Sequence, residues 1–304
     1  MVLTSHRRRT VPALVLILLL ALAGCGSSSS SSSSTSGSTS SSAASGADPA
    51  IAAMVPSAIA SKGSVTVATD ASYAPNEFFA SDGKTIIGMD VDLGHALGKV
   101  MGVQWNFVEA GFDGIIPGLA SGKYDIGMSS FGDTKEREQT VDFVTYAKAG
   151  TAIYIKAGGT QLPNLAAMCG HSIGVEKGTT QLADLTAQNT KCKNAGKPEI
   201  DIQAFPDQNG ANTALAAGRV DAAMADTPVA DYAVAQSNGQ FALSGSSYGV
   251  VPYGIAVPKG TGMTKPIEAA LKKVIANGTY LKILKKWGVQ SIAIDNPVIN
   301  GAVS

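Results

Sequence analysis

Short apolar strands alternate with amphipathic helices along most of the chain. Strands are predicted at residues 65–69, 103–108 and 126–128, each a short run of β-branched or aliphatic side chains. A shorter helix is expected at 115–120. The helix before the second strand has apolar residues at intervals of three and four, namely Leu93, Ala96, Leu97, Val100 and Met101.

The first of these helices has residues suited to both of its ends. Asp90 or Asp92 can cap its N-terminus, since a carboxylate accepts hydrogen bonds from free backbone N–H groups. Gly102 can end it, because glycine adopts the left-handed conformation that follows many helices.

A second alternating series begins near residue 150. A helix is expected to open at 178–181 and another at 212–218, and the chain then returns as an extended segment at 249–257. The strands of this series are predicted at 152–155, 172–175, 200–205 and 220–224. The two series show no repeat of each other, so they indicate an α/β fold without duplication.

One long helix is expected near the C-terminus. Its apolar face consists of Ile267, Ala270, Leu271, Val274 and Ile275. Its lysines fit a solvated face, with contact to a partner or a membrane surface as the alternative. These lysines are Lys272, Lys273, Lys282, Lys285 and Lys286.

The N-terminal residues are typical of an export signal. Three arginines precede an almost wholly apolar segment at 11–22. About a dozen apolar residues are too few for a bilayer span of roughly 20, so residues 1–24 are predicted to be a signal peptide. The run Leu-Ala-Gly-Cys ending at Cys25 resembles the lipobox of bacterial lipoproteins, which implies lipidation of Cys25. An ordinary signal peptide with a chance cysteine is the alternative.

A tether is expected after Cys25. Residues 26–46 are almost entirely Ser, Thr, Gly and Ala, which have little apolar surface to bury, and we assign residues 25–59 to the lipidated cysteine and its tether. Loss of the three signal arginines from a neutral precursor leaves about three net negative charges. That balance argues against a nucleic-acid partner, which would require a basic surface.

Cys169 and Cys192 are the other cysteines of the chain. Outside the cytoplasm an even pair within one segment indicates a disulfide, with two buried free thiols as the alternative. No metal or other cofactor is predicted. A structural zinc site needs four ligands, and only His95 and His171 remain as histidines after the signal.

A G-x-S-x-G motif at 245–249 does not predict a hydrolase. That nucleophile elbow needs a helix directly after the serine, whereas Val-Val-Pro-Tyr follows here. No histidine lies downstream of Ser247, so the order of a hydrolase triad is absent from the sequence.

Polar side chains follow several of the predicted strands. In an open α/β sheet, ligands bind beyond the carboxyl ends of the strands. A guanidinium pairs with a carboxylate, a helix N-terminus offers amides to the same anion, and a carboxylate takes an ammonium. The candidates suit such a zwitterion: Asp70, Tyr73, Ser129, Ser130, Arg137, Thr179, Thr180, Gln181 and Asp226.

From about residue 64 to 287 the chain resembles the family 3 extracellular solute-binding proteins, the polar amino-acid receptors of ABC importers. The match is clearest at 88–93 (GMDVDL) and 96–98 (ALG), and residues 68–75 are similar to the family's ligand loop. Further fitting blocks, in order, are 112–113, 116–119, 122–125, 129–130, 141–143, 178–181, 218–223, 278–280 and 286–288, with Thr134 and Arg137.

The resemblance implies how the backbone groups of an amino acid would be held. Arg137 would grip the ligand carboxylate, assisted by Ser130 and Thr180. Asp226 would hold the amine.

The resemblance also implies contacts to the ligand side chain. Asp70 and Ser129 would face it, and Tyr73 and Phe112 would pack against its aliphatic part. Gly132 departs from the pattern, because many relatives have Ser or Thr there. With Asp226 spent on the amine, Asp70 is left for a side chain that brings a donor. Amide and cationic ligands therefore rank first and acidic ones second.

The expected fold is two-lobed, of the type II periplasmic-binding-protein kind, with an open sheet flanked by helices in each lobe and a two-strand hinge. Lobe one is expected at 60–147 plus 252–295, and lobe two at 148–251. The implied protein is no enzyme but a monomer that delivers a polar or charged L-amino acid to an ABC permease. It would be anchored to the outer face of the cytoplasmic membrane, or periplasmic where an outer membrane is present. The alternatives are a sensor for a membrane receptor and a dehydratase on the same fold.

Overall fold

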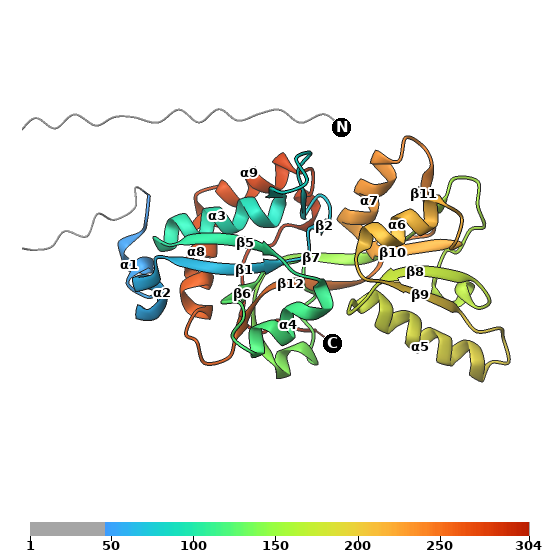
Figure 1. Ribbon diagram of the computed structural model, residues 1–304, viewed down its shortest axis with the longest axis horizontal. Helices are drawn as coiled ribbons and strands as arrows, with labels where there is room; N and C mark the ends of the chain where they lie inside the picture. Colours follow the sequence, from blue (N-terminus) through green and yellow to red (C-terminus); the bar gives the residue numbers. More distant parts are fainter. Residues whose placement is uncertain (1–45, 304) are drawn as a thin grey trace, which may run out of the picture. The chain divides into compact units, whose positions relative to one another are not determined.

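The computed structural model describes residues 46–303, so the predicted signal peptide, Cys25 and most of the predicted tether lie outside the described residues. The chain has the predicted α/β class (Figure 1). Its strands are β1 (Ser64–Thr69), β2 (Ser72–Tyr73), β3 (Glu77–Phe79), β4 (Ile86–Ile87), β5 (Gln104–Glu109), β6 (Ile126–Gly127), β7 (Val141–Lys156), β8 (Ser172–Glu176), β9 (Asp201–Phe205), β10 (Ala222–Asp226), β11 (Phe241–Leu243) and β12 (Tyr248–Pro258). Its α-helices are α1 (Pro49–Ala52), α2 (Ser57–Lys62), α3 (Met89–Met101), α4 (Phe112–Ala120), α5 (Thr180–Asn194), α6 (Gln208–Ala216), α7 (Thr227–Gln236), α8 (Thr264–Ala276) and α9 (Thr279–Lys286).

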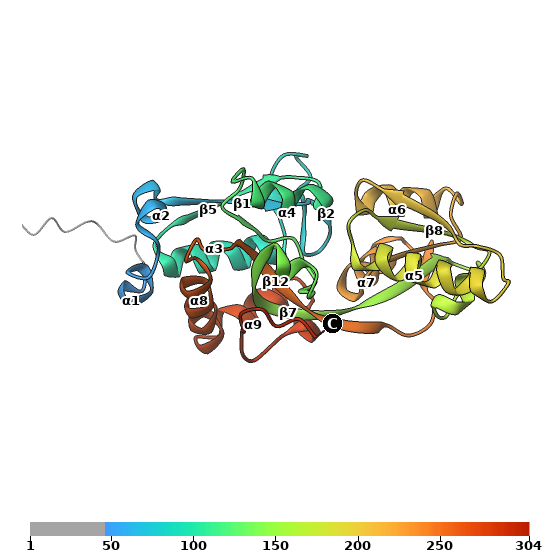
Figure 2. The same ribbon diagram turned by 90° about the horizontal axis from the view of Figure 1, so that it is seen from below.

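Lobe one is built on the parallel strands β5, β1 and β6, next to the second half of β12 and the first half of β7. Helices α3, α8 and α9 cover one face of this sheet and α4 covers the other (Figures 1 and 2). The predicted apolar face of α3 packs into this core, where Leu93 and Leu97 are fully buried. A small antiparallel sheet, β2-β3-β4, belongs to the same lobe.

Lobe two is built on β10, β8 and β9, with the second half of β7 and the short β11. Helix α5 lies on one face of these strands, while α6 and α7 lie on the other (Figure 1). Cys169 and Cys192 form the predicted disulfide, which ties the segment before β8 to the last turns of α5.

Two strands, β7 and β12, run antiparallel to each other through both lobes and form the predicted hinge (Figure 2). β7 is 16 residues long, far longer than the predicted 152–155. Its pairing with β12 shifts register between Tyr248 and Val251, and again between Tyr253 and Gly254. Such irregularities bend a strand and increase its local twist.

The predicted cap of α3 is wrong. Gly88 precedes the helix, and no side chain caps it. The side chain of Asp90 is buried instead, and its Oδ2 accepts hydrogen bonds from the Tyr146 hydroxyl at 2.8 Å and the Ser130 N–H at 3.0 Å. The Asp90 carboxylate, which we predicted to cap the helix, is thus bound by residues distant in the sequence instead. The C-terminus is as predicted, since Gly102 has φ 72°.

The folded part begins earlier than predicted. Residues 48–59, which we assigned to the tether, form α1 and the first half of α2. Ile51 and Val55 are buried in the core of lobe one. These two apolar residues give the segment a face to bury, which the serine-rich residues before it lack.

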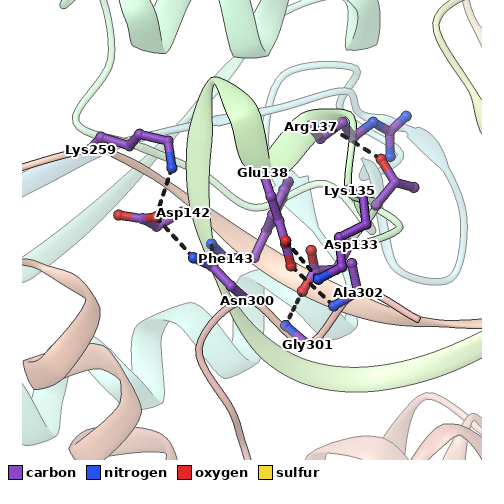
Figure 3. Close-up of polar contacts among 11 residues, drawn as sticks. Asp133, Lys135, Arg137, Glu138, Asp142, Phe143, Lys259, Asn300, Gly301 and Ala302 are labelled. Atoms are coloured by element: carbon purple, nitrogen blue, oxygen red, sulfur yellow. Dashed lines mark hydrogen bonds and ion pairs between the residues drawn. The ribbon is translucent and has the colours of Figure 1, made fainter. Parts of the chain in front are cut away.

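The folded part also continues past residue 295. The backbone N–H of Asn300 donates to the carbonyl of Phe143, so this segment runs along the outer edge of β7. The N–H of Gly301 donates to Asp133 at 2.7 Å, and that of Ala302 donates to Glu138 at 3.1 Å (Figure 3). The C-terminal residues therefore hold the loop between β6 and β7.

The predicted long C-terminal helix is two helices. Gly278, with φ 78°, separates α8 from α9, and a left-handed residue cannot continue an α-helix. All five lysines are exposed, as a solvated face requires. Within residues 46–303, no helix has both the length and the apolar composition to span a membrane.

Candidate ligand-binding site

The residues predicted to bind ligand meet around one cavity between the lobes. All ten predicted residues line it, together with two others: Asp70, Tyr73, Phe112, Ser129, Ser130, Gly132, Arg137, Glu176, Thr179, Thr180, Gln181 and Asp226.

Strand ends explain why distant residues meet here. Asp70 directly follows β1, and Ser129 comes shortly after β6 in lobe one. Glu176 and Asp226 are the last residues of β8 and β10 in lobe two. The carboxyl ends of parallel neighbours lie at the same sheet edge, so each lobe presents its strand ends to the cavity.

Arg137 reaches both lobes. Its Nη1 donates to the carbonyl of Gly132 at 2.8 Å, and its Nη2 donates to the carbonyl of Gly178, in lobe two, at 2.8 Å. The guanidinium also lies over the rings of Phe112 and Phe131, 5.4 and 5.6 Å from their centroids. A guanidinium has five N–H donors, so these contacts fix its plane and leave donors for an anion.

Asp226 is buried and is held from two sides. Its Oδ1 accepts a hydrogen bond from the Gln181 amide at 2.7 Å, and its Oδ2 accepts one from the Tyr253 hydroxyl at 2.7 Å. Burial raises the pKa of Asp226, while the hydrogen bonds from Tyr253, Gln181 and Tyr73 and the charge of Arg137 oppose that rise. A carboxylate has about four lone-pair sites, so it can also accept from an ammonium.

Asp70 is held by the backbone around it. Its Oδ1 accepts from the N–H of Ser72 at 3.1 Å, and its Oδ2 accepts from the N–H of Phe112 at 3.0 Å. Burial raises its pKa, an effect that these hydrogen bonds reduce and that the charge of Asp207 increases.

Ser129 and Ser130 connect the cavity to a buried acidic network. The Ser129 Oγ accepts from the N–H of Asp70 at 2.9 Å and donates to Glu77 at 3.1 Å. The Ser130 Oγ accepts from the Asn76 amide at 2.9 Å and contacts Glu77 at 3.3 Å. Both hydroxyls therefore already have protein partners.

The N-terminus of α5 forms one wall of the cavity. Thr179 is its cap, and the Thr179 Oγ1 accepts from the N–H of Leu182 at 3.3 Å. Gln181 lies in the first turn, and its side-chain amide donates hydrogen bonds to Asp226 and Thr151. The hydroxyl of Thr179 thus positions the helix, whereas Thr180 lines the cavity at the first helical residue.

Glu176 is the lining acid that the sequence analysis missed. The pattern placed the end of this strand at residue 175 and drew attention to the glycine-threonine turn that follows. The rule used for Asp226, that the last residue of a strand faces the ligand, would have found Glu176 as well.

The remaining sequence motifs contribute nothing to the site. Tyr248 begins β12, so a strand and not a helix follows Ser247, and the elbow geometry does not form. His95 is exposed on α3. Within the part of the chain that the structure describes, no three His, Cys, Asp or Glu side chains gather in a group able to hold a metal ion.

Relatives share both the sequence and the fold of this chain. The arginine-binding protein ArgT of Corynebacterium glutamicum is 34% identical over 254 residues, which cover 83% of each protein. The lysine/arginine/ornithine-binding periplasmic protein of Escherichia coli is 33% identical over 233 residues, 73% of this chain and 86% of that protein. An ancestral arginine-binding protein solved with arginine superposes with a TM-score of 0.68 at 36% identity, covering 74% of this chain and 98% of that one.

Residues 65–290 match the model of a protein family, and this range contains every residue that lines the cavity. The α/β fold of the described residues agrees with that of the solved relative. The chain belongs to the bacterial extracellular solute-binding proteins, family 3.

Proposed function

We propose that this chain receives a polar or cationic L-amino acid outside the cytoplasm and presents it to the permease of an ABC importer. The observation that carries the proposal is that Arg137 and the buried carboxylate of Asp226 line the same cavity. Opposite charges held at fixed positions match the two ends of an amino-acid zwitterion. The relatives named above as binding arginine, lysine and ornithine support the same ligand class.

The ligand carboxylate would bind Arg137 and the N-terminus of α5 at Thr180. Arg137 has free donors after its two carbonyl contacts, and a helix N-terminus favours an anion. Ser130 would assist, although its hydroxyl must then share its contacts with Glu77. The ammonium would bind Asp226.

The side chain of the ligand would lie between Tyr73 and Phe112 and end near Asp70 and Ser129. The half-buried ring of Phe112 offers apolar surface to methylene groups. Asp70 would accept a hydrogen bond from the far end of the side chain. Amide and cationic amino acids therefore rank above acidic ones.

Several finer features belong to the same proposal. The protein would be exported through its signal peptide, anchored by lipid on Cys25, and act as a monomer without a cofactor. Lobe one would comprise 60–147 plus 252–295, and lobe two 148–251, with α1, the first half of α2 and the segment after residue 295 attached to lobe one. We propose no catalytic role, since the relatives reported above are binding proteins.

Calorimetric titration of the purified protein with each of the twenty amino acids tests the proposal. We expect saturable binding of at least one cationic or amide amino acid. Tight binding of leucine with no detectable binding of any polar amino acid would refute the ligand class and the role of Asp70. A sugar that binds where amino acids do not would refute the receptor proposal itself.

A further inference from the structure

Glu176 is an acid without a partner at the wall of the cavity. Its side chain is 2% exposed and belongs to the last residue of β8. It lines the cavity, and its Oε1 is buried without a hydrogen-bond partner. A buried carboxylate oxygen that lacks a donor is costly, so this position calls for a donor from whatever fills the cavity.

The charges around Glu176 favour a cation. The carboxylates of Asp70 and Asp226 line the same cavity as Glu176, and the guanidinium of Arg137 lines it as well. Burial, followed by the charges of Asp70, Asp207, Asp226 and Asp113, raises the pKa of Glu176 well above the usual range. An amino-acid zwitterion brings no net charge of its own. A positive ligand side chain therefore reduces the excess of lining carboxylates, whereas a neutral side chain leaves it unchanged.

Glu176 differs from Asp70 in the hydrogen bonds that its carboxylate oxygens accept from the protein. Both oxygens of Asp70 already accept backbone hydrogen bonds, from Ser72 and Phe112. Asp70 can therefore tolerate a neutral side chain close to it. The Oε1 of Glu176 has no such supply, so a ligand that fails to offer a donor leaves it buried and unpaired.

We propose that Glu176 is the specificity-determining residue that selects a cationic side chain over a neutral one of the same shape. The proposal rests on the proposed function, because it assumes that the zwitterionic end of the ligand binds Arg137 and Asp226. In this arrangement Glu176 accepts a charge-assisted hydrogen bond from a guanidinium or ammonium group.

Arginine and citrulline make the sharpest test. The two differ in one terminal group, where a carbonyl oxygen replaces a charged nitrogen. We expect the wild-type protein to prefer arginine by roughly 10- to 100-fold in calorimetric titration, because charged hydrogen bonds contribute about twice as much as neutral ones. This comparison needs no variant. Equal affinities would overturn the inference.

Variants assign the preference to one residue. In Glu176→Gln the arginine-to-citrulline ratio should fall about tenfold or more, while citrulline binds as tightly as before or more tightly. The matched control is Glu199→Gln, which makes the same change of charge at an exposed position of lobe two and should keep the wild-type ratio. A Glu176→Gln ratio equal to that of wild type would overturn the assignment, and a loss of preference confined to Asp70→Asn would assign it to Asp70.

The same titrations keep the two proposals apart. If arginine and citrulline bind equally, the proposed selection of cationic side chains by Glu176 is wrong, but the proposal that the chain binds an amino acid is unaffected. If no amino acid binds wild-type protein, the receptor itself fails. Glu176→Asp provides a folded check where Glu176→Gln is unstable, because it keeps the charge and should retain a preference for arginine.

Discussion

The hydroxyl of Tyr73 in lobe one accepts a hydrogen bond from the backbone N–H of Asp226 in lobe two, with 2.9 Å between the two atoms. The ring of Tyr73 packs in the same cluster as Tyr154 and Val229 of lobe two. Tyr73 therefore joins the lobes at the residue that we assign to the ligand amine, and closure and binding share one contact.

Removing the Tyr73 hydroxyl should lower the affinity for ligand more than it lowers the stability of the fold. In Tyr73→Phe the Asp226 N–H loses its partner, and we expect affinity for arginine to fall roughly 2- to 10-fold, the usual effect of one hydrogen bond. Tyr280→Phe is the control, because the Tyr280 hydroxyl bonds only within lobe one, to Tyr146 and Ile294. That control should lower the Tm and keep the affinity. The reverse pattern would contradict the role of Tyr73 in closure.

Arg137→Ala should have the largest effect on affinity. Loss of one partner of a desolvated charge pair costs about 2–5 kcal/mol, so binding should weaken roughly 30-fold or more. The variant should remain folded, since the two hydrogen bonds of Arg137 go to loop carbonyls. Arg219→Ala, at an exposed position of lobe two, is the control. Calorimetry that finds near-wild-type affinity in Arg137→Ala would disprove its assignment to the ligand carboxylate.

The disulfide should stabilise lobe two without contributing to the site. Cys169 and Cys192 are 23 residues apart, and closing such a loop is worth about 3 kcal/mol on the chain-entropy model. The double variant Cys169→Ser, Cys192→Ser should melt at a lower temperature and bind with unchanged affinity. Two reactive thiols in the unfolded, unreduced wild-type protein would mean that the bridge does not form.

Binding of arginine should strengthen as the pH rises. Burial and the charges of Asp70, Asp207, Asp226 and Asp113 raise the pKa of Glu176, so below that pKa the acid is protonated and offers no charge to a cation. Affinity for arginine should increase through that pKa and then level off, with protons released on binding. Titration in two buffers of different ionisation enthalpy measures the release. Citrulline should show a smaller pH dependence, and an equal one would contradict the prediction.

Asp133 should make stability depend on pH. Its carboxyl is fully buried, and burial together with Glu138 raises its pKa to about 6. A folded pKa above the unfolded value near 3.9 stabilises the fold below about pH 4, and this contribution is lost as the pH rises through about 6.

Asp133→Asn removes that dependence. Relative to wild type, the variant should gain up to about 2–3 kcal/mol of unfolding stability between pH 4 and pH 8. Thermal denaturation across this range measures the difference, and acids that do not interact with Asp133 cancel because both proteins contain them. A difference that stays constant with pH would show that Asp133 titrates normally.

The spacing of apolar residues along the chain predicted those elements that pack one continuous apolar face on a core. The apolar spacing around Leu93 and Leu97 is enough to specify α3, since that face packs on one core. The hinge strand β7 was recognised only at 152–155, because its first half mixes Lys148 and Thr145 with apolar residues. Those polar residues fit a strand only once β12 and the C-terminal segment pair with it.

All ten residues predicted to bind ligand line the cavity, and the missed Glu176 and the misassigned Asp90 have a common cause. Asp226 and Glu176 hold equivalent positions at strand ends, but the strand of Glu176 was predicted to stop one residue early. Asp90 was misassigned because its partners, Tyr146 and Ser130, lie far away in sequence. Boundaries and buried polar contacts both depend on tertiary neighbours that periodicity does not encode.

The hinge has a consequence for how such a protein can be rebuilt. Ala149 on β7 pairs with Val251 on β12, and Lys148 pairs with Pro252. The chain thus leaves lobe one and re-enters it at adjacent points, so everything between is an insertion with neighbouring ends. A tight turn joining these points would turn the two strands into an ordinary hairpin and leave lobe one continuous. A lobe two from another protein would need only the same pair of adjoining ends to be grafted in its place.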